Sequence, residues 1–255
     1  MKRVLILCIG FCLVIGNISW AQSNSLQEET PQSMFNKGLS YYNDKNYLEA
    51  AYWYLKAAEQ GKKEAQSNLG LMYYCGYGVA QDYVEAFKWY KKAAEQGVAI
   101  AQTQVGMLYY FGYGVKKDDM EAVKWSRKAA EQGIKEAQFN LGICYFNGWG
   151  ITKDNLEAVY WYRKAAEQGH ATAQNNLGDM YKNGYGVAKD YEEALKWFRK
   201  SVEQGDSYGQ NSMGTMYENG YGVPKDKIEA VKWYTKSAEQ DCEHAIENLK
   251  RLLGE

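Results

Sequence analysis

The chain repeats one unit of 36 residues along most of its length. A tryptophan recurs at this spacing in every copy, at Trp53, Trp89, Trp125, Trp161, Trp197 and Trp233. From Gly61 onward a glycine closes each copy, at Gly97, Gly133, Gly169 and Gly205, and Asp241 takes its place in the next copy. A fixed period of this length indicates an array of stacked structural units. With 255 residues, of which 46% are apolar, the chain can bury the core that such an array needs.

Each copy predicts two short helices. In the copy 62–97, the first helix places Ala65, Leu69 and Tyr73 on one stripe, at i, i+4 and i+8. The second has apolar residues at i, i+3, i+4, i+7 and i+8, which is a helical period and not that of a strand. The tryptophan column and the first tyrosine column lie on these stripes, so we expect both in the core. The tyrosine column consists of Tyr41, Tyr73, Tyr109, Tyr145, Tyr181 and Tyr217.

The segment between the helices carries turn and cap signals. In Gly76-Tyr77-Gly78-Val79 the first glycine can adopt the left-handed conformation that stops a helix, and the second keeps the turn tight. Val79 is expected to hold the loop against the core. Asp82 and Glu85 form an Asp-x-x-Glu helix start, whose carboxylates favour the positive end of the helix dipole. The closing Gly97 caps the second helix.

The repeated pattern A-x-x-x-L-G-x-x-Y-x-x-G-x-G-V-x-x-D-x-x-x-A-x-x-W-Y-x-K-A-A-E-Q-G resembles the Sel-like repeat (SLR) family, relatives of tetratricopeptide repeats with longer loops. The resemblance covers about residues 62–240, with partial units at 32–61 and 241–253. It implies an all-α superhelix, or solenoid, of antiparallel helix pairs that acts as an adaptor for proteins or peptides.

We expect one uninterrupted solenoid over residues 32–253. Its hairpins are predicted at 32–61, 62–97, 98–133, 134–169, 170–205 and 206–241, followed by a capping helix at 242–253. The first hairpin lacks the Gly-x-Gly loop, and Asn43-Asp44-Lys45-Asn46 predicts a tighter turn. In the last helix Lys250 and Arg251 suit the solvated face that a terminal repeat presents.

The first 21 residues are of a different kind. Lys2 and Arg3 precede an apolar run at 4–15, and Ser19-Trp20-Ala21 offers a small-x-small cleavage site. This predicts a secretory signal peptide at 1–21, followed by a polar, disordered leader at 22–31. An uncleaved membrane anchor is the alternative, although the run is short for a span. We therefore expect no membrane span in the mature chain, and a bacterial periplasm or extracellular location. An ER lumen is the second possibility.

The net charge and the positions of the histidines and cysteines limit the classes of function that the chain can have. The formal net charge of −1, from 30 basic and 31 acidic residues, is not that of a nucleic-acid binder. Metal sites need clustered ligands, and the only histidines are His170 and His244, two units apart. After the signal peptide, Cys75, Cys144 and Cys242 lie in different columns, too far apart to pair, which leaves free thiols or an intermolecular bridge. No cofactor is expected.

No catalytic constellation stands out. Neither histidine accompanies a Ser or Cys nucleophile, and the Gly-x-Gly loops follow helices and lack the Lys-Ser/Thr of a phosphate-binding loop. One secreted branch of the SLR family is linked to penicillin binding, but that branch carries paired cysteines in each repeat, which this chain lacks. We therefore predict a protein that is not an enzyme, with a penicillin-recognising activity as one alternative.

A ligand should bind where the columns vary on the inner face, which by resemblance to tetratricopeptide units comes from the first helices. The early hairpins offer apolar and aromatic residues there, and the later ones offer polar residues. The predicted groove consists of Leu39, Tyr42, Leu71, Tyr74, Met107, Tyr110, Phe111, Phe139, Ile143, Phe146, Asn175, Asp179, Lys182, Asn211 and Glu218. An exposed aromatic patch commonly marks a binding surface, and amides can pair with an extended peptide backbone. The alternative is that Tyr74, Tyr110 and Phe146 merely pack between neighbouring first helices.

The sequence thus predicts a secreted scaffold that binds a protein or peptide in a concave groove. A structural role in assembly of the cell envelope is the other alternative. The identity of the partner and the oligomeric state stay open.

Overall fold

The computed structural model describes residues 29–254, and all regular structure within them is helical. The expected signal peptide, 1–21, and residues 22–28 of the expected leader lie outside the described part. None of the described helices is both long and apolar enough to cross a bilayer.

The helices follow one another as hairpins along the chain. The first six are α2 (Pro31–Asn43), α3 (Tyr47–Glu59), α4 (Lys63–Cys75), α5 (Tyr83–Glu95), α6 (Ala99–Phe111) and α7 (Asp119–Glu131). The next six are α8 (Lys135–Asn147), α9 (Asn155–Glu167), α10 (Ala171–Asn183), α11 (Tyr191–Glu203), α12 (Ser207–Asn219) and α13 (Lys227–Ala238). The last helix, α14 (Glu243–Leu253), is unpaired and packs on α13.

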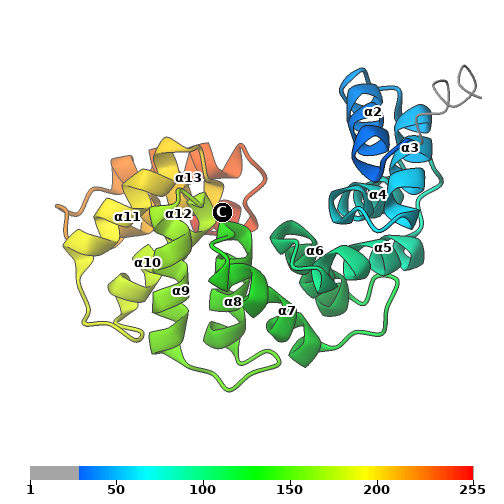
Figure 1. The fold of residues 1–255 in the computed structure, drawn as a ribbon. Helices are drawn as coiled ribbons and strands as arrows, with labels where there is room; N and C mark the ends of the chain where they lie inside the picture. The colour runs from blue at the N-terminus through cyan, green and yellow to red at the C-terminus, as the bar shows by residue number, and fades with distance from the viewer. Residues whose placement is uncertain (1–28, 255) are drawn as a thin grey trace, which may run out of the picture.

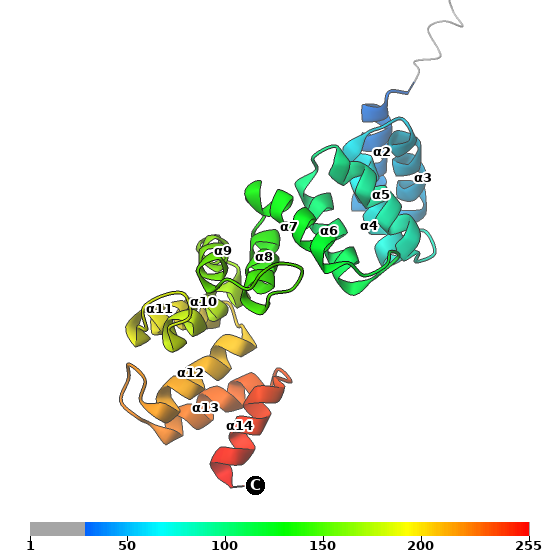
Figure 2. The ribbon, with the colours of Figure 1, turned by 90° about the horizontal axis from the view of Figure 1, so that it is seen from below.

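The hairpins are arranged in a curved superhelix, which confirms the predicted all-α solenoid. In Figure 1 the N-terminal arm, coloured blue to cyan, and the C-terminal arm, coloured yellow to red, stand on either side of a bend formed by α6, α7 and α8. Seen from below, the hairpins follow one another along an elongated path (Figure 2). The second helix of each hairpin contacts the first helix of the next, so each unit buries its apolar stripe against its neighbour.

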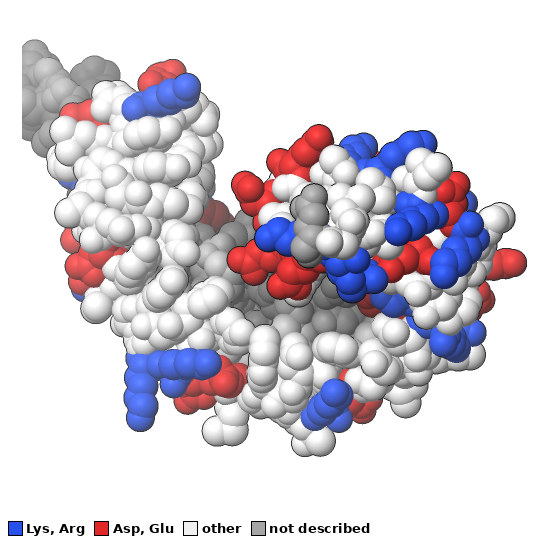
Figure 3. Space-filling model, turned by 180° about the vertical axis from the view of Figure 1, so that it is seen from behind, with Lys and Arg blue, Asp and Glu red and all other residues white. Residues whose placement is uncertain are grey.

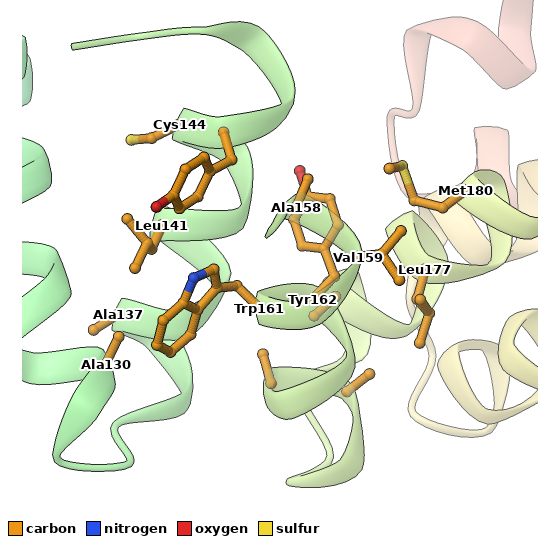
Figure 4. Close-up of a cluster of buried hydrophobic side chains, with 14 of the residues drawn as sticks. Ala130, Ala137, Leu141, Cys144, Ala158, Val159, Trp161, Tyr162, Leu177 and Met180 are labelled. Carbon is orange, nitrogen blue, oxygen red and sulfur yellow. The ribbon is translucent and has the colours of Figure 1, made fainter. Parts of the chain in front are cut away.

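The core is divided into clusters that lie between successive hairpins. Figure 4 shows part of one cluster, in which Trp161 of α9 is directed toward Ala137 and Leu141 of α8. Four tryptophans of the column, Trp89, Trp125, Trp161 and Trp197, are buried as expected. Trp53 is half-buried because no hairpin precedes it, and Trp233, which packs against the cluster around Leu195 and Phe198, is also half-buried.

The first tyrosine column is less buried than predicted. Tyr145 is buried and Tyr181 half-buried, and their hydroxyls accept hydrogen bonds from Arg127 Nη2 and Arg163 Nη2 of the preceding hairpins, at 2.6 and 2.7 Å. The core assignment is wrong for Tyr41, which is exposed. Tyr41 belongs to the first hairpin, so no preceding hairpin covers it.

The helix caps form as the sequence predicts. Asp82 Oδ1 accepts hydrogen bonds from the backbone N–H groups of Val84 and Glu85, at 2.8 and 3.1 Å. The corresponding aspartates Asp118, Asp154, Asp190 and Asp226 cap their helices in the same way. In the first hairpin α2 ends at Asn43 and α3 begins at Tyr47, which is the expected tighter turn, with Lys45 in the left-handed region at φ 59°.

The second loop glycine has a role beyond the tightness of the turn. A Cβ on Gly78 would lie 2.1 Å from the carbonyl oxygen of Tyr47, at the start of the second helix of the preceding hairpin. Gly114 and Gly150 are equally close, at 2.0 Å, to Tyr83 and Asp119. These long loops therefore lie directly against the backbone of the previous unit, and only glycine leaves room for this contact. In the last loop Gly222 is less tightly placed, because its Cβ would lie 3.0 Å from the nearest atom of the previous unit.

A column of buried glutamines links the hairpins. Gln138 Nε2 donates to the carbonyl oxygen of Ala130, near the end of the preceding hairpin, at 3.1 Å. Gln168 Nε2 then donates to Gln138 Oε1 at 2.8 Å. The same pair of hydrogen bonds recurs around Gln66, Gln102 and Gln174. The sequence analysis did not identify these glutamines, whose burial depends on the neighbouring hairpin.

Candidate functional site

The inner side of the curve is lined by first helices, as Figure 1 shows for α6 and α8. Figure 3 shows the molecule from behind, where the surface is hollowed between the two arms. On this face the N-terminal arm carries few charged side chains, whereas lysines, arginines and carboxylates are interspersed over the C-terminal arm. The surface on this side therefore changes from mostly uncharged on the N-terminal arm to charged on the C-terminal arm.

An apolar cavity of about 220 Å³ lies between α6, α7 and α8. Four predicted groove residues line it: Met107, Tyr110, Phe111 and Ile143. The Phe111 side chain is 54% exposed, so it forms part of the open rim. The structure thus brings together groove residues from two successive first helices around one opening.

Other residues of this cavity were missed by the sequence analysis. They are Gly106, Ala122, Ser126, Asn140, Cys144 and Trp149. One signal was available, because Ser126 stands in a column that holds Tyr or Phe in every other hairpin. Trp149 belongs to the long loop that follows α8, a segment that the groove prediction did not include.

A second cavity of about 280 Å³ lies one repeat further along. Its walls include Phe146, Asp179 and Tyr185, which occupy the columns of Tyr110, Ile143 and Trp149. The remaining walls add the amides of Asn176 and Asn183. Two equivalent inter-repeat sites therefore differ in chemistry: the first is almost wholly apolar, and the second is more polar, with amides and a carboxylate beside aromatic rings.

The polar groove residues of the C-terminal half are partly engaged within the protein. Asp179 pairs with Lys182 on α10, with 2.5 Å between Oδ1 and Nζ. Both side chains remain accessible to solvent, so this pair could exchange for a charged ligand. A half-buried pair between residues three apart on one helix contributes little to stability.

Three of the polar predictions need correction. Asn175 is buried, and its Oδ1 accepts a hydrogen bond from Ser212 Oγ at 2.8 Å, because this column faces the next first helix. Asn211 Oδ1 accepts from Asn248 of the capping helix at 3.0 Å. The Glu218 carboxylate accepts hydrogen bonds from Nη1 and Nη2 of Arg251, at 2.6 and 2.7 Å. This guanidinium lowers the pKa of the Glu218 carboxyl. These side chains join α12 to its neighbours and do not present free groups to a ligand.

The remaining groove residues have varied environments. Leu39 is exposed, whereas Tyr42, Leu71, Tyr74, Phe139 and Phe146 are half-buried. Phe139 stacks on the ring of His170 with 4.3 Å between the ring centroids. Tyr42 and Tyr74 contact Tyr47 and Tyr83 at the start of the second helix of their own hairpins. Tyr74 thus packs within its own hairpin and not between neighbouring first helices, while Tyr110 borders the apolar cavity.

The titratable residues offer little for catalysis in the described part. The three cysteines there are free, and burial raises the pKa of Cys144 to about 11, so its thiol is unreactive near neutral pH. Among residues 29–254 no group of three His, Cys, Asp or Glu side chains is placed to hold a metal ion. His170 Nδ1 accepts a hydrogen bond from the Ala173 N–H at 3.2 Å, which makes this histidine a helix cap.

Comparison with known proteins gives the class of the chain. The family model of the Sel1 repeat matches residues 33–62, 63–98, 99–134, 135–170, 171–206 and 207–242. The chain belongs to the Sel1 repeat family. No curated protein matches it in a sequence search.

Two solved structures of this family are similar to the chain. One is a protective antigen of uropathogenic Escherichia coli strains with an SLR fold, with 40% identity and a TM-score of 0.79 over 91% of this chain. The chain spans 50% of the length of that structure. The other is a Sel1 repeat protein from Oxalobacter formigenes, with 36% identity and a TM-score of 0.81 over 85% of this chain and 86% of that one. Sel1 repeat proteins are generally non-enzymatic scaffolds that bind protein partners.

Proposed function

We propose that this protein is a non-enzymatic scaffold, exported from the cytoplasm, that binds an extended peptide segment of a partner protein along its concave face. The observation that carries the proposal is the pair of equivalent sites between successive first helices, one almost wholly apolar and one more polar. An extended peptide that crosses both sites would meet an apolar opening first and amide and carboxylate groups next.

The energetics favour a partner at the apolar site. Phe111 and Trp149 are 54% and 39% exposed on its rim, and aromatic side chains in a concavity are typical anchors of interfaces. The polar site adds amides that can both donate to and accept from a peptide backbone. The Asp179 carboxylate and the Lys182 ammonium allow selection among charged side chains.

The exported location rests on the sequence of residues 1–21, with its basic start, apolar run and Ala21 cleavage site. A bacterial periplasm is the compartment that we propose. Mass spectrometry of the protein recovered from a bacterial envelope fraction should find an N-terminus at Gln22. An intact Met1 on the recovered protein would contradict this proposal.

The groove is tested by affinity capture with a pair of matched variants. The double variant Y110A/F146A removes one half-buried aromatic ring from the edge of each site. The control M120A/L156A removes two apolar side chains that are 71% and 69% exposed on the second helices, outside the groove. We expect the first variant to lose at least about tenfold in affinity for any partner that the parent captures. Unchanged capture by a folded Y110A/F146A protein, or loss in the control alone, would contradict the groove.

A purely structural role in the envelope is the remaining candidate function. The penicillin-recognising alternative gains no support, because the three cysteines of the described part are unpaired. A bare groove with no specific partner in these experiments would favour the structural role.

A further inference from the structure

The third hairpin lacks a ring that every other hairpin has. In five hairpins an aromatic side chain of the second helix packs on a glycine of the first. The pairs are Tyr54 on Gly38, Tyr90 on Gly70, Tyr162 on Gly142, Phe198 on Gly178 and Tyr234 on Gly214. A Cβ on any of these glycines would lie 2.6 to 2.8 Å from a ring carbon, so the ring requires the glycine. In the third hairpin the partner of Gly106 is Ser126.

The apolar cavity lies where this ring is missing. Both Gly106 and Ser126 line it, and its volume is about 220 Å³. An apolar cavity of roughly 150 Å³ is known to hold a benzene molecule. Met107 and Ile143 supply further apolar wall, and Tyr110 an aromatic one, so the Ser126 cavity has the size and the surface to accept an aromatic ring.

A polar group lies at the position that suits a phenol hydroxyl. In the second and fifth units the residues at this position in the column, Asn68 and Asn176, stand 14 residues after Tyr54 and Tyr162. Asn140 stands at the same distance along the chain from Ser126 and lines the cavity.

The cavity is also accessible from the proposed groove. Phe111 and Trp149 on its rim are exposed, and Tyr110 and Ile143 belong to the inner faces of α6 and α8. A side chain that enters from a peptide in the groove would meet Gly106 and Ser126 at the inner end.

We propose that the Ser126 cavity binds the phenol ring of a tyrosine side chain that a peptide partner inserts, with its hydroxyl on the Asn140 amide. The ring would restore in the third hairpin the ring-on-glycine contact of the other five. This inference rests on the proposed function, because the tyrosine arrives on the peptide that the groove binds.

Small phenols test the cavity without a partner. The purified protein is titrated with p-cresol and, separately, with toluene, which has the same ring and methyl group but no hydroxyl. We expect saturable binding of p-cresol at one site, with chemical-shift changes at Ser126 and Asn140, and about tenfold weaker binding of toluene. Equal affinity for both probes would overturn the choice of tyrosine, and no binding of either at millimolar concentration would overturn the site.

Variants separate the ring from the hydroxyl. S126Y places a covalent ring in the cavity and should raise the melting temperature and abolish p-cresol binding. S126L, a smaller filler, is measured alongside in case the larger side chain prevents folding. N140L should bring p-cresol affinity down to that of toluene. The matched control is S40Y, at an exposed position of α2, which should leave p-cresol binding unchanged. Full p-cresol affinity in S126Y and S126L would overturn the site.

The partner distinguishes this inference from the proposed function. If Y110A/F146A loses the partner but S126Y retains it fully, the tyrosine insertion is overturned and the groove stands. The opposite outcome is loss of p-cresol binding in S126Y with partner capture unchanged in both S126Y and Y110A/F146A. In that case the ring site stands and the groove function is overturned.

Discussion

Gln168 Nε2 lies 2.8 Å from Gln138 Oε1, although the two residues are 30 positions apart. Gln138 is 3% exposed and also donates to the carbonyl oxygen of Ala130 in the preceding hairpin. The buried Gln138 amide therefore makes hydrogen bonds to one group of its own hairpin and to one group of the preceding hairpin. A buried polar side chain is tolerated only when its hydrogen bonds are made, so this contact specifies how successive hairpins dock.

The substitution Gln138→Ala should destabilise the protein by about 1 to 3 kcal/mol, because it removes two hydrogen bonds of a buried side chain, while the Ala130 carbonyl oxygen still accepts from the Gly133 N–H. Gln168→Ala removes only the exposed donor of the hydrogen bond to Gln138 Oε1 and should cost less than about 1 kcal/mol. Urea unfolding followed by circular dichroism measures both values. Equal costs for the two variants would show that the buried amide has no special role.

Trp125→Ala should cost roughly 3 to 5 kcal/mol, because it removes a large buried side chain from the packing between hairpins. Trp125 is 6% exposed, and its Nε1 donates to Glu121 Oε2 at 3.1 Å. Thermal and urea unfolding give the measurement. A variant with the unfolding midpoint of the parent would refute the core assignment of this column.

Two glycine substitutions separate backbone strain from contact between hairpins. Gly133 has a φ of 91° and open space around the position of a Cβ, so Gly133→Ala should cost about 1 to 2 kcal/mol for the left-handed conformation alone. Gly150 has a φ of 65°, and its Cβ would lie 2.0 Å from the Asp119 carbonyl oxygen. Gly150→Ala should therefore cost clearly more and increase amide hydrogen exchange in the loop 148–154. Equal costs would mean that the loop can move away from the preceding hairpin freely.

His170 should make stability depend on pH below neutrality. Burial lowers its pKa, opposed in part by Glu136, and Nδ1 accepts the Ala173 N–H only when it is unprotonated. The unfolded chain therefore binds the proton more readily. Stability should be constant above the unfolded pKa of about 6.5 and fall as pH drops through the lower folded pKa.

Melting temperatures measured from pH 7.5 to 5.0 test this dependence. His170→Asn keeps a capping side chain that does not titrate, so it should flatten the profile. The matched control His244→Asn changes an exposed histidine of α14 and should leave the profile of the parent. A parent profile that His170→Asn does not alter would contradict the role of this cap.

The repeated features were predictable from the sequence because every copy carries the same turn, cap and core residues at the same positions. The glycine at Gly76, the aspartate at Asp82 and the tryptophan at Trp89 recur together, so helix end, helix start and buried face could be placed in one unit and carried to the others. The solenoid followed from this periodicity, and the pattern of residues within the unit carried the resemblance to the Sel-like repeat family, which the family model confirms.

The candidate site was only partly predictable because it lies between units. The columns of the first helices identified Met107, Tyr110 and Ile143, but Ser126 belongs to a second helix, where variation was not examined for binding. Asn175 was assigned to the groove because helical position alone does not show that its column faces the next first helix. For both Ser126 and Asn175, the packing of neighbouring hairpins determines whether the side chain lines the site.

The glycine that faces each aromatic ring has a consequence for how such arrays acquire new specificities. Gly142 already provides the space that Tyr162 fills, just as Gly106 does for Ser126. If the Ser126 cavity binds a tyrosine ring as proposed, a single exchange of Tyr162 for serine would open an equivalent cavity one unit along, at a cost in stability. One substitution per hairpin would then be enough to change where along the superhelix such a ring binds.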